Sequence, residues 1–129
     1  MHLVPQERRS QRVLDDERVC QAISSLGEPG NVVAWSQRFG LLSDPSRLAL
    51  LLCIHHAGPI SVTDLAVATD MRHTTVSQAL RLLRASGTVV PERDGRVVRY
   101  AMADAEIAEL LERVTSAASS AARYHAAHR

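Results

Sequence analysis

The stretch from residue 59 to residue 99 constrains the fold more than any other part of the chain. It holds two short segments with helical spacing of apolar residues, a tight break between them, and then two β-rich runs around Asp94-Gly95. Asp-Gly between β-branched runs is a strong hairpin signal, because the favoured two-residue turns need positive φ. This order predicts a mainly α-helical winged helix-turn-helix with a small β-hairpin.

Local signals set the expected bounds of the two helices. Ser61 can cap the first helix by accepting a backbone N–H three residues on. The second is expected to begin at Thr74 or Thr75 and to end at Gly87, which can adopt the left-handed conformation of a helix C-terminus. Its apolar residues recur at helical spacing and comprise Val76, Leu80 and Leu83.

The other face of the second helix and the hairpin carry side chains suited to DNA. Hydroxyl, amide and guanidinium groups can bond phosphates and base edges, and arginines on a hairpin can reach a narrow minor groove. The predicted DNA contacts are Arg72, His73, Thr74, Thr75, Ser77, Gln78, Arg81, Arg84, Arg93, Arg96 and Arg99. Arg93 is expected at the hairpin tip, with Arg96 and Arg99 on the return strand.

Positive charge is concentrated in the same region. Residues 71–99 hold six arginines against two carboxylates, a net charge of +4, whereas the whole chain carries only +1. A patch of one sign on a nearly neutral chain is typical of proteins that bind a duplex. We therefore expect double-stranded DNA as the partner.

Composition fits one small domain in a reducing compartment. The chain has 129 residues and 3% aromatic residues, so its core must be aliphatic. No run approaches the roughly 20 apolar residues of a membrane span, and no signal-peptide pattern opens the chain, so we expect a cytoplasmic protein without a membrane partner. Cys20 and Cys53 are too few for a disulfide framework and are expected to be buried thiols.

Three segments are expected along the chain. Residues 1–13 are polar and Arg-rich and are predicted to be a disordered tail, residues 14–123 to form the winged helix-turn-helix with its dimerisation helices, and residues 124–129 to be a His-containing tail. Within the domain, Asn31 is expected to cap a helix. Pro45 suits the first position of the next one, the central core helix, which should reach about His56.

The segments LLSDPSRLALLLCI, SVTDLAVAT, TTVSQALRLLR and DGRVVRYAMAD resemble the ArsR/SmtB family of metal-responsive repressors over about residues 36–115. Members usually have T-V-S-x-H-L-x-x-L-R in the recognition helix, and here Ala79 replaces the histidine. The resemblance implies a DNA-binding regulator, a repressor rather than an enzyme. It also implies a homodimer built from the first and last helices.

The last helix carries the predicted dimer interface. Asp104 can cap it, and an apolar stripe without an evident partner in the chain follows. The stripe consists of Ile107, Leu110, Leu111 and Val114. A two-fold dimer would cover it and place two recognition helices about 34 Å apart, one duplex turn.

The resemblance also implies a metal site. The family's cysteine site has no counterpart, because residues 62–65 supply no thiolate. The family's other site pairs Asp-x-His at the start of the last helix with His-x-x-His or His-x-x-Glu further on. This chain keeps Asp104, but it has Glu106 in place of the first histidine, and Ala117 and Ser120 in place of the later pair. Two tail histidines remain at i, i+3 spacing. The predicted site comprises Asp104, Glu106, His125 and His128, for nickel, cobalt or zinc with nickel favoured. The span from Asp104 to His125, about 31 Å of helix, requires a folded tail or a second subunit.

The sequence leaves several alternatives open. The tail histidines can equally be solvated, and His55 and His56 are expected to cap the end of the core helix. A thiol-redox sensor requires Cys20 and Cys53 to lie within about 7 Å of each other between Cα atoms. A winged helix that binds a protein is the other alternative. We do not expect an enzyme, because the sequence contains no phosphate loop and no known catalytic arrangement.

Overall fold

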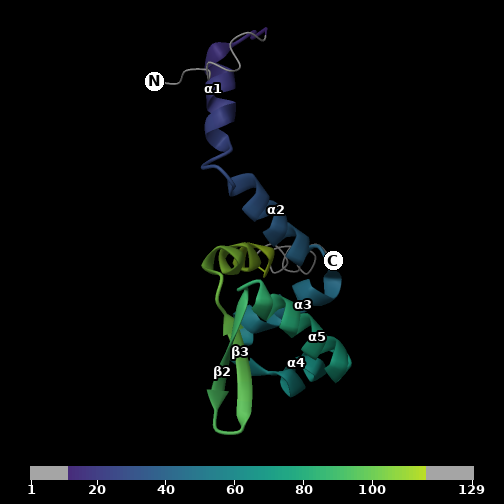
Figure 1. Ribbon diagram of the computed structural model, residues 1–129. Coiled ribbons are helices and arrows are strands. Elements are labelled where there is room, and N and C mark those ends of the chain that lie inside the picture. The colour runs from purple at the N-terminus through teal and green to yellow at the C-terminus, as the bar shows by residue number, and fades with distance from the viewer. Residues whose placement is uncertain (1–11, 116–129) are drawn as a thin grey trace, which may run out of the picture. The chain divides into compact units, whose positions relative to one another are not determined.

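The computed structural model describes residues 12–115, so the predicted tail at residues 124–129 and most of that at residues 1–13 lie outside it. Its elements are α1 (Asp16–Ser25), α2 (Asn31–Leu42), α3 (Pro45–Ala57), β1 (Ile60–Ser61), α4 (Val62–Thr69), α5 (His73–Ala85), β2 (Val89–Asp94), β3 (Val97–Met102) and a helix over residues 105–115 (Figure 1). We call this last element the 105–115 helix. The chain divides into two compact units, residues 1–39 and 40–129. Within residues 12–115, no helix is both long and apolar enough to cross a bilayer.

Short polar side chains cap the first turns of α3 and α4. Asp44 accepts a bond of 3.0 Å from the backbone N–H of Arg47, and Ser61 accepts one of 3.2 Å from that of Asp64. Pro45 occupies the first turn of α3, where its missing N–H leaves no bond unmade. These caps confirm the predicted starts of α3 and α4.

Two predicted helix starts were wrong in detail. Asn31 is the first residue of α2, and its side chain donates a bond of 2.9 Å to the carbonyl of Leu26 just after α1. An amide that donates there satisfies a carbonyl at the end of the preceding helix instead of capping its own. The recognition helix α5 begins at His73, one residue before the predicted Thr74.

The break between α4 and α5 depends on Asp70. This residue ends α4 in the left-handed conformation, with φ 54°. Its backbone N–H approaches the carbonyls of Ala66 and Val67, which lie at the end of α4. Aspartate tolerates this conformation better than most residues with a Cβ. The turn therefore stays tight, and α5 packs against α4.

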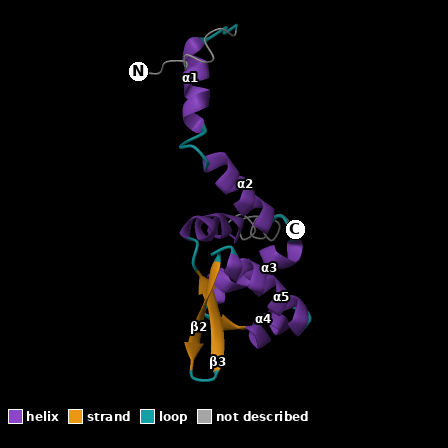
Figure 2. Ribbon diagram, in the orientation of Figure 1, coloured by secondary structure: helices purple, strands orange, loops and turns teal. Residues whose placement is uncertain are grey.

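The wing is a three-stranded antiparallel sheet in the order β1-β3-β2 (Figure 2). The short strand β1 was not predicted. It pairs Ile60 with Tyr100 and Ser61 with Arg99, and so ties the start of α4 to the central strand β3. The hairpin is thereby attached to the helix-turn-helix along its inner strand.

The hairpin turn lies one residue later than predicted. Asp94 pairs with Val97, so the two turn residues are Gly95 and Arg96. Gly95 has φ +63°, whereas Asp70 is the one non-glycine residue with positive φ among those described. Glycine thus occupies the first central position, as in a type II′ turn. Arg96 consequently lies at the tip, and Arg93 lies on β2 opposite Val98.

The core joins all parts of the second unit. Its buried side chains are Leu50, Leu51, Ile54, Leu65, Val76, Leu80, Leu83, Val89, Ile107 and Leu111. Ile107 and Leu111 of the 105–115 helix are 0% exposed, so their assignment to a dimer interface was wrong. An apolar stripe shows that a helix face is buried but does not identify the chain that buries it. Leu110 is half-buried and Val114 is 44% exposed, so these two remain candidates for that interface.

Candidate nucleic-acid interface and histidine cluster

Helix α5 has one buried and one exposed face, as the spacing predicted. Val76, Leu80 and Leu83 are at most 1% exposed. The predicted DNA contacts of this region that are exposed are Arg72, His73, Thr74, Thr75, Gln78, Arg81 and Arg84, whereas Ser77 is half-buried. Gln78 and Arg81 are three residues apart and therefore neighbours on the helix surface. An amide and a guanidinium in that position can read base edges in a major groove.

The turn after α5 connects the recognition helix to the wing through backbone hydrogen bonds. The backbone N–H of Thr88 donates a bond of 2.9 Å to the carbonyl of Leu83, at the end of α5. The carbonyl of Thr88 accepts bonds from the N–H groups of Ala103 (2.9 Å) and Asp104 (3.3 Å), which follow β3. Thr88 is 1% exposed. This buried residue therefore links α5, β3 and the start of the 105–115 helix.

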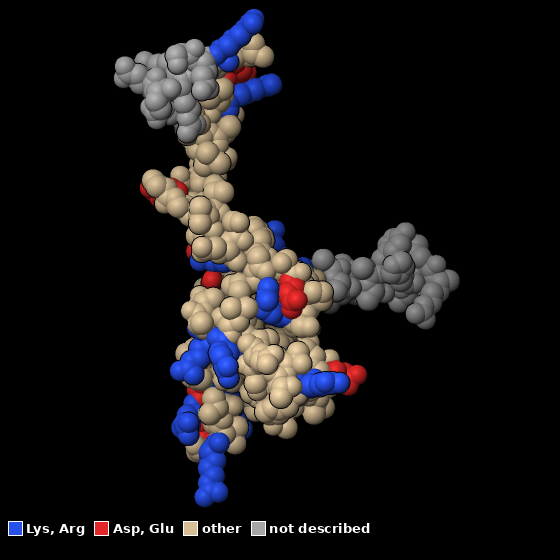
Figure 3. Space-filling model, turned by 45° about the vertical axis from the view of Figure 1, so that its right-hand side comes forward, with Lys and Arg blue, Asp and Glu red and all other residues tan. Residues whose placement is uncertain are grey.

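The three wing arginines differ in their surroundings. Arg93 and Arg96 are exposed, and arginine side chains project around the hairpin end of the molecule in Figure 3. Arg99 is half-buried on the central strand, and its Nη1 lies 2.8 Å from Oδ2 of Asp94. An arginine that already has a carboxylate partner offers little net charge to a phosphate. Arg93 and Arg96 are therefore the stronger candidates for DNA contact.

The predicted metal residues are only partly described by the structure. Oδ1 of Asp104 accepts bonds from the N–H groups of Glu106 (3.0 Å) and Ile107 (3.2 Å), which confirms it as the cap of the 105–115 helix. The side chain of Glu106 is exposed. His125 and His128 lie outside the described residues, so the four predicted ligands stay a prediction.

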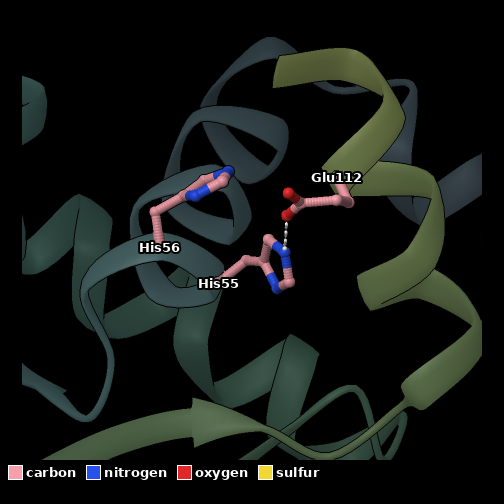
Figure 4. Close-up of side chains that lie close together, drawn as sticks. All are labelled: His55, His56 and Glu112. Carbon is pink, nitrogen blue, oxygen red and sulfur yellow. Dashed lines mark hydrogen bonds and ion pairs between the residues drawn. The ribbon is translucent and has the colours of Figure 1, made fainter. Parts of the chain in front are cut away.

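A different group of possible ligands does come together. His55 and His56, at the end of α3, and Glu112, on the 105–115 helix, have ligand atoms within 4.8 Å of one another. The close-up in Figure 4 shows the two imidazoles beside the carboxylate, with Nε2 of His55 2.7 Å from Oε2 of Glu112. Nε2 of His56 lies 2.7 Å from Oγ1 of Thr115. The arrangement joins two helices through side chains that can bind a cation.

The expected capping role of His55 and His56 was therefore wrong. Their imidazoles bond side chains of the 105–115 helix, while the α3 carbonyl of Ile54 accepts the backbone N–H of Gly58. Glu112 was not among the predicted site residues. His55 and Glu112 are 57 positions apart in the sequence, so no local sequence pattern marks their contact. Only the folded structure, in which α3 and the 105–115 helix meet, identifies it.

Comparison with known proteins agrees with the fold. Residues 42–99 match a family model described as the MarR family. The chain is 35% identical to the HTH-type transcriptional regulator NmtR of Mycobacterium tuberculosis over 127 residues, which cover 98% of this chain and 88% of that protein. It is 38% identical to the transcriptional repressor SmtB homolog of Synechocystis sp. over 76 residues, which cover 59% of this chain and 57% of that protein.

A solved structure gives the same result. The cadmium metal-sensor CMTR from Mycobacterium tuberculosis is similar with a TM-score of 0.53 and 33% identity, covering 60% of this chain and 80% of that chain. The first two relatives are described as a transcriptional regulator and a transcriptional repressor, which confirms the prediction that the chain is not an enzyme. Both the resemblance and the winged helix-turn-helix prediction are also confirmed. The chain therefore belongs to the ArsR/SmtB family of winged helix-turn-helix transcriptional regulators and is a DNA-binding regulator of transcription.

Proposed function

We propose that the protein is a sequence-specific repressor that binds double-stranded operator DNA as a homodimer and whose DNA affinity is controlled by a divalent metal ion. The observation that carries DNA reading is the exposed polar face of α5 opposite its buried apolar stripe. Gln78 and Arg81 are assigned to base edges, because an amide suits adenine and a guanidinium suits guanine. The relative from Synechocystis is described as a repressor, which supports repression.

Phosphate contacts are assigned to the remaining exposed cations. Arg72 and Arg84 flank the exposed face of α5, and Arg93 and Arg96 lie on the wing. Contacts to phosphates position a protein on the duplex without reading its sequence. Each neutralised phosphate also releases a counterion, so these residues determine the dependence of binding on salt.

Exposed apolar side chains support a homodimer. In the first unit, large apolar residues that are 47–62% exposed comprise Leu26, Val32, Val33 and Phe39. On the 105–115 helix, Val114 is 44% exposed. Burial of such surface is favourable by about 25 cal/mol for each Å². We assign the subunit interface to the first two helices and to Leu110 and Val114, with Ile107 and Leu111 excluded because they lie in the core.

Metal control is supported by the relatives and by the available ligands. One structural relative is described as a cadmium metal-sensor. In this chain the start of α4 offers no thiolate, since residues 62–65 read VTDL. Imidazole and carboxylate groups suit nickel, cobalt or zinc, and we favour nickel. The site predicted from the sequence, with Asp104, Glu106, His125 and His128, is one candidate.

Two alternatives retain the same fold. A thiol-redox sensor would use Cys20 and Cys53, which are free thiols in the first and second units respectively. A winged helix that binds a protein instead of DNA is disfavoured by the exposed arginines on α5 and the wing. DNA titration under oxidising and reducing conditions addresses the first alternative.

One titration tests the proposed function as a whole. A duplex selected by the purified protein from a random-sequence pool is titrated at one fixed salt concentration without metal and with nickel, cobalt or zinc. We expect tight binding of a dimer without metal and weaker binding with at least one of the ions. If no duplex is enriched, DNA reading is contradicted; if affinity is the same with every ion, metal control is contradicted.

A further inference from the structure

We propose that His55, His56 and Glu112 form a divalent metal site that joins the end of α3 to the 105–115 helix (Figure 4). This inference rests on the proposed metal control and names a site for it. It differs from the site predicted from the sequence, because it uses no residue of the tail. Each ligand lies within residues 12–115, where the structure describes the geometry.

The spacing of the ligand atoms fits one ion after a small adjustment. Zinc binds imidazole nitrogen and carboxylate oxygen at about 2.0 to 2.2 Å, which places neighbouring ligand atoms roughly 3 Å apart. The contact between His55 and Glu112 already measures 2.7 Å, and all three ligand atoms lie within 4.8 Å. His56 and Glu112 are exposed, so rotation of their side chains can close the remaining gap.

The chemistry of the three groups favours a borderline divalent cation. Two imidazoles and one carboxylate form a set of nitrogen and oxygen ligands that suits zinc, nickel and cobalt. The hydrogen bond from His55 to Glu112 already pairs a ring nitrogen with a carboxylate oxygen, and an ion can take the place of that shared proton. The imidazoles also lie in the last turn of α3, where the helix dipole favours positive charge.

The position of the ligands in the chain connects the site to the DNA-binding helix. His55 directly follows the buried Ile54, and Glu112 directly follows the buried Leu111. Both of these apolar residues belong to the core that also contains Leu80 of α5. A densely packed core transmits a small shift of one helix to its neighbours. Metal binding at the two ligand-bearing helices can therefore change how α5 is presented to DNA.

Linkage gives this coupling a measurable form. If metal lowers the affinity for DNA by some factor, DNA must lower the affinity for metal by the same factor. A ratio of about 5 to 150 is typical for coupled sites. In variants without the ligands, the affinity for DNA should be the same with and without metal, while the metal-free protein still binds DNA.

The test compares ligand variants with a matched control. His56→Gln and Glu112→Gln each remove one ligand while keeping a hydrogen-bonding side chain. Glu109→Gln removes the same charge from an exposed position on the same helix. Removal of residues 124–129 deletes His125 and His128. The affinity of each protein for nickel, cobalt and zinc is measured by competition with a chromophoric chelator, and the cobalt absorption spectrum reports the ligand set.

We expect His56→Gln and Glu112→Gln to weaken metal binding at least about 100-fold, because loss of a mere outer partner of a ligand already costs about 10 to 100-fold. Glu109→Gln and the truncated protein should match the wild type. The cobalt spectrum should change in the two ligand variants. Metal should raise the thermal unfolding midpoint of the wild type and the control by more than that of the ligand variants, which also verifies that all of them fold.

The outcomes separate this site from the proposed function. If the ligand variants bind metal as the wild type does, the inference is overturned, and metal control survives if DNA affinity still responds. Loss of binding in the truncated protein alone would assign the metal to the tail. If the wild type binds none of the three ions, the inference and metal control both fail. If the ligand variants lose metal binding but metal never alters DNA affinity, the site stands and metal control is overturned.

Discussion

Helix α5 and the 105–115 helix show how much an amphipathic pattern reveals. Both carry apolar residues at helical spacing, and in both the buried members are at most 1% exposed: Val76, Leu80 and Leu83 in α5, and Ile107 and Leu111 in the last helix. For α5, the prediction that this stripe faces the core was confirmed. For the last helix, the same kind of stripe was assigned to a second subunit, and the structure places two of its four residues, Ile107 and Leu111, in the chain's own core.

The difference lies in the inferred partner, since the helix faces themselves were identified correctly. Burial of apolar surface is favourable whichever chain supplies the covering groups. A stripe therefore identifies a buried face but not its partner. For the last helix, the core of the same chain supplies that partner, and His55 and His56 of α3 bond Glu112 and Thr115 of this helix.

The largest expected effect separates core from interface on the last helix. Leu111→Ala should lower the free energy of unfolding by about 2 to 5 kcal/mol, because it leaves a cavity in a packed core. Val114→Ala should change it by less than about 1 kcal/mol, since Val114 is 44% exposed. Urea denaturation followed by circular dichroism measures both. Equal losses would contradict the division of the helix into core and surface positions.

The next effect concerns the exposed face of α5. Gln78→Ala and Arg81→Ala should each cost about 1 to 3 kcal/mol per subunit in binding to the selected duplex, because each removes one contact to a base edge from each subunit. Binding to a shuffled duplex should fall much less. Fluorescence anisotropy at one salt concentration measures both duplexes. Equal losses on the two would show that these side chains do not read sequence.

A smaller effect tests what the last helix leaves for a partner. Val114→Glu should keep the fold but raise the dimer dissociation constant at least tenfold, about 1.4 kcal/mol. The charge would be introduced at a position that the proposed interface buries. Sedimentation velocity over a concentration series measures the constant, with Glu109→Gln as a surface control. A dimer as stable as the wild type would place the interface elsewhere.

The smallest effect distinguishes the arginines of the wing. Arg93→Ala and Arg96→Ala should each reduce the slope of log affinity against log salt by about 1.8 for the bound dimer, because each removes one phosphate contact per subunit, worth about 0.9. Arg99→Ala should leave the slope nearly unchanged, since Arg99 is paired with Asp94 at 2.8 Å. Titrations at four salt concentrations measure the slopes. A larger change for Arg99 than for Arg96 would mean that the ion pair opens on DNA.

Local signals in the sequence determined most of the winged helix-turn-helix. The caps at Asp44, Ser61 and Asp104 each depend on a bond to a residue two or three positions away, which residue type and spacing predict. The buried and exposed faces of α5 follow in the same way from the helical period. The DNA-reading candidates Gln78 and Arg81 could therefore be chosen without a structure.

Tertiary structure decided the features that depend on residues far apart. Strand β1 forms because Ile60 pairs with Tyr100. The group of His55, His56 and Glu112 forms because α3 and the last helix meet there. The hairpin turn lies one residue later than predicted, because strand pairing as well as turn propensity sets its position. Residue types and spacing encode what the backbone does over one or two helical turns. Which helix and strand faces come together depends on packing of the whole core, and that packing forms only when the chain folds.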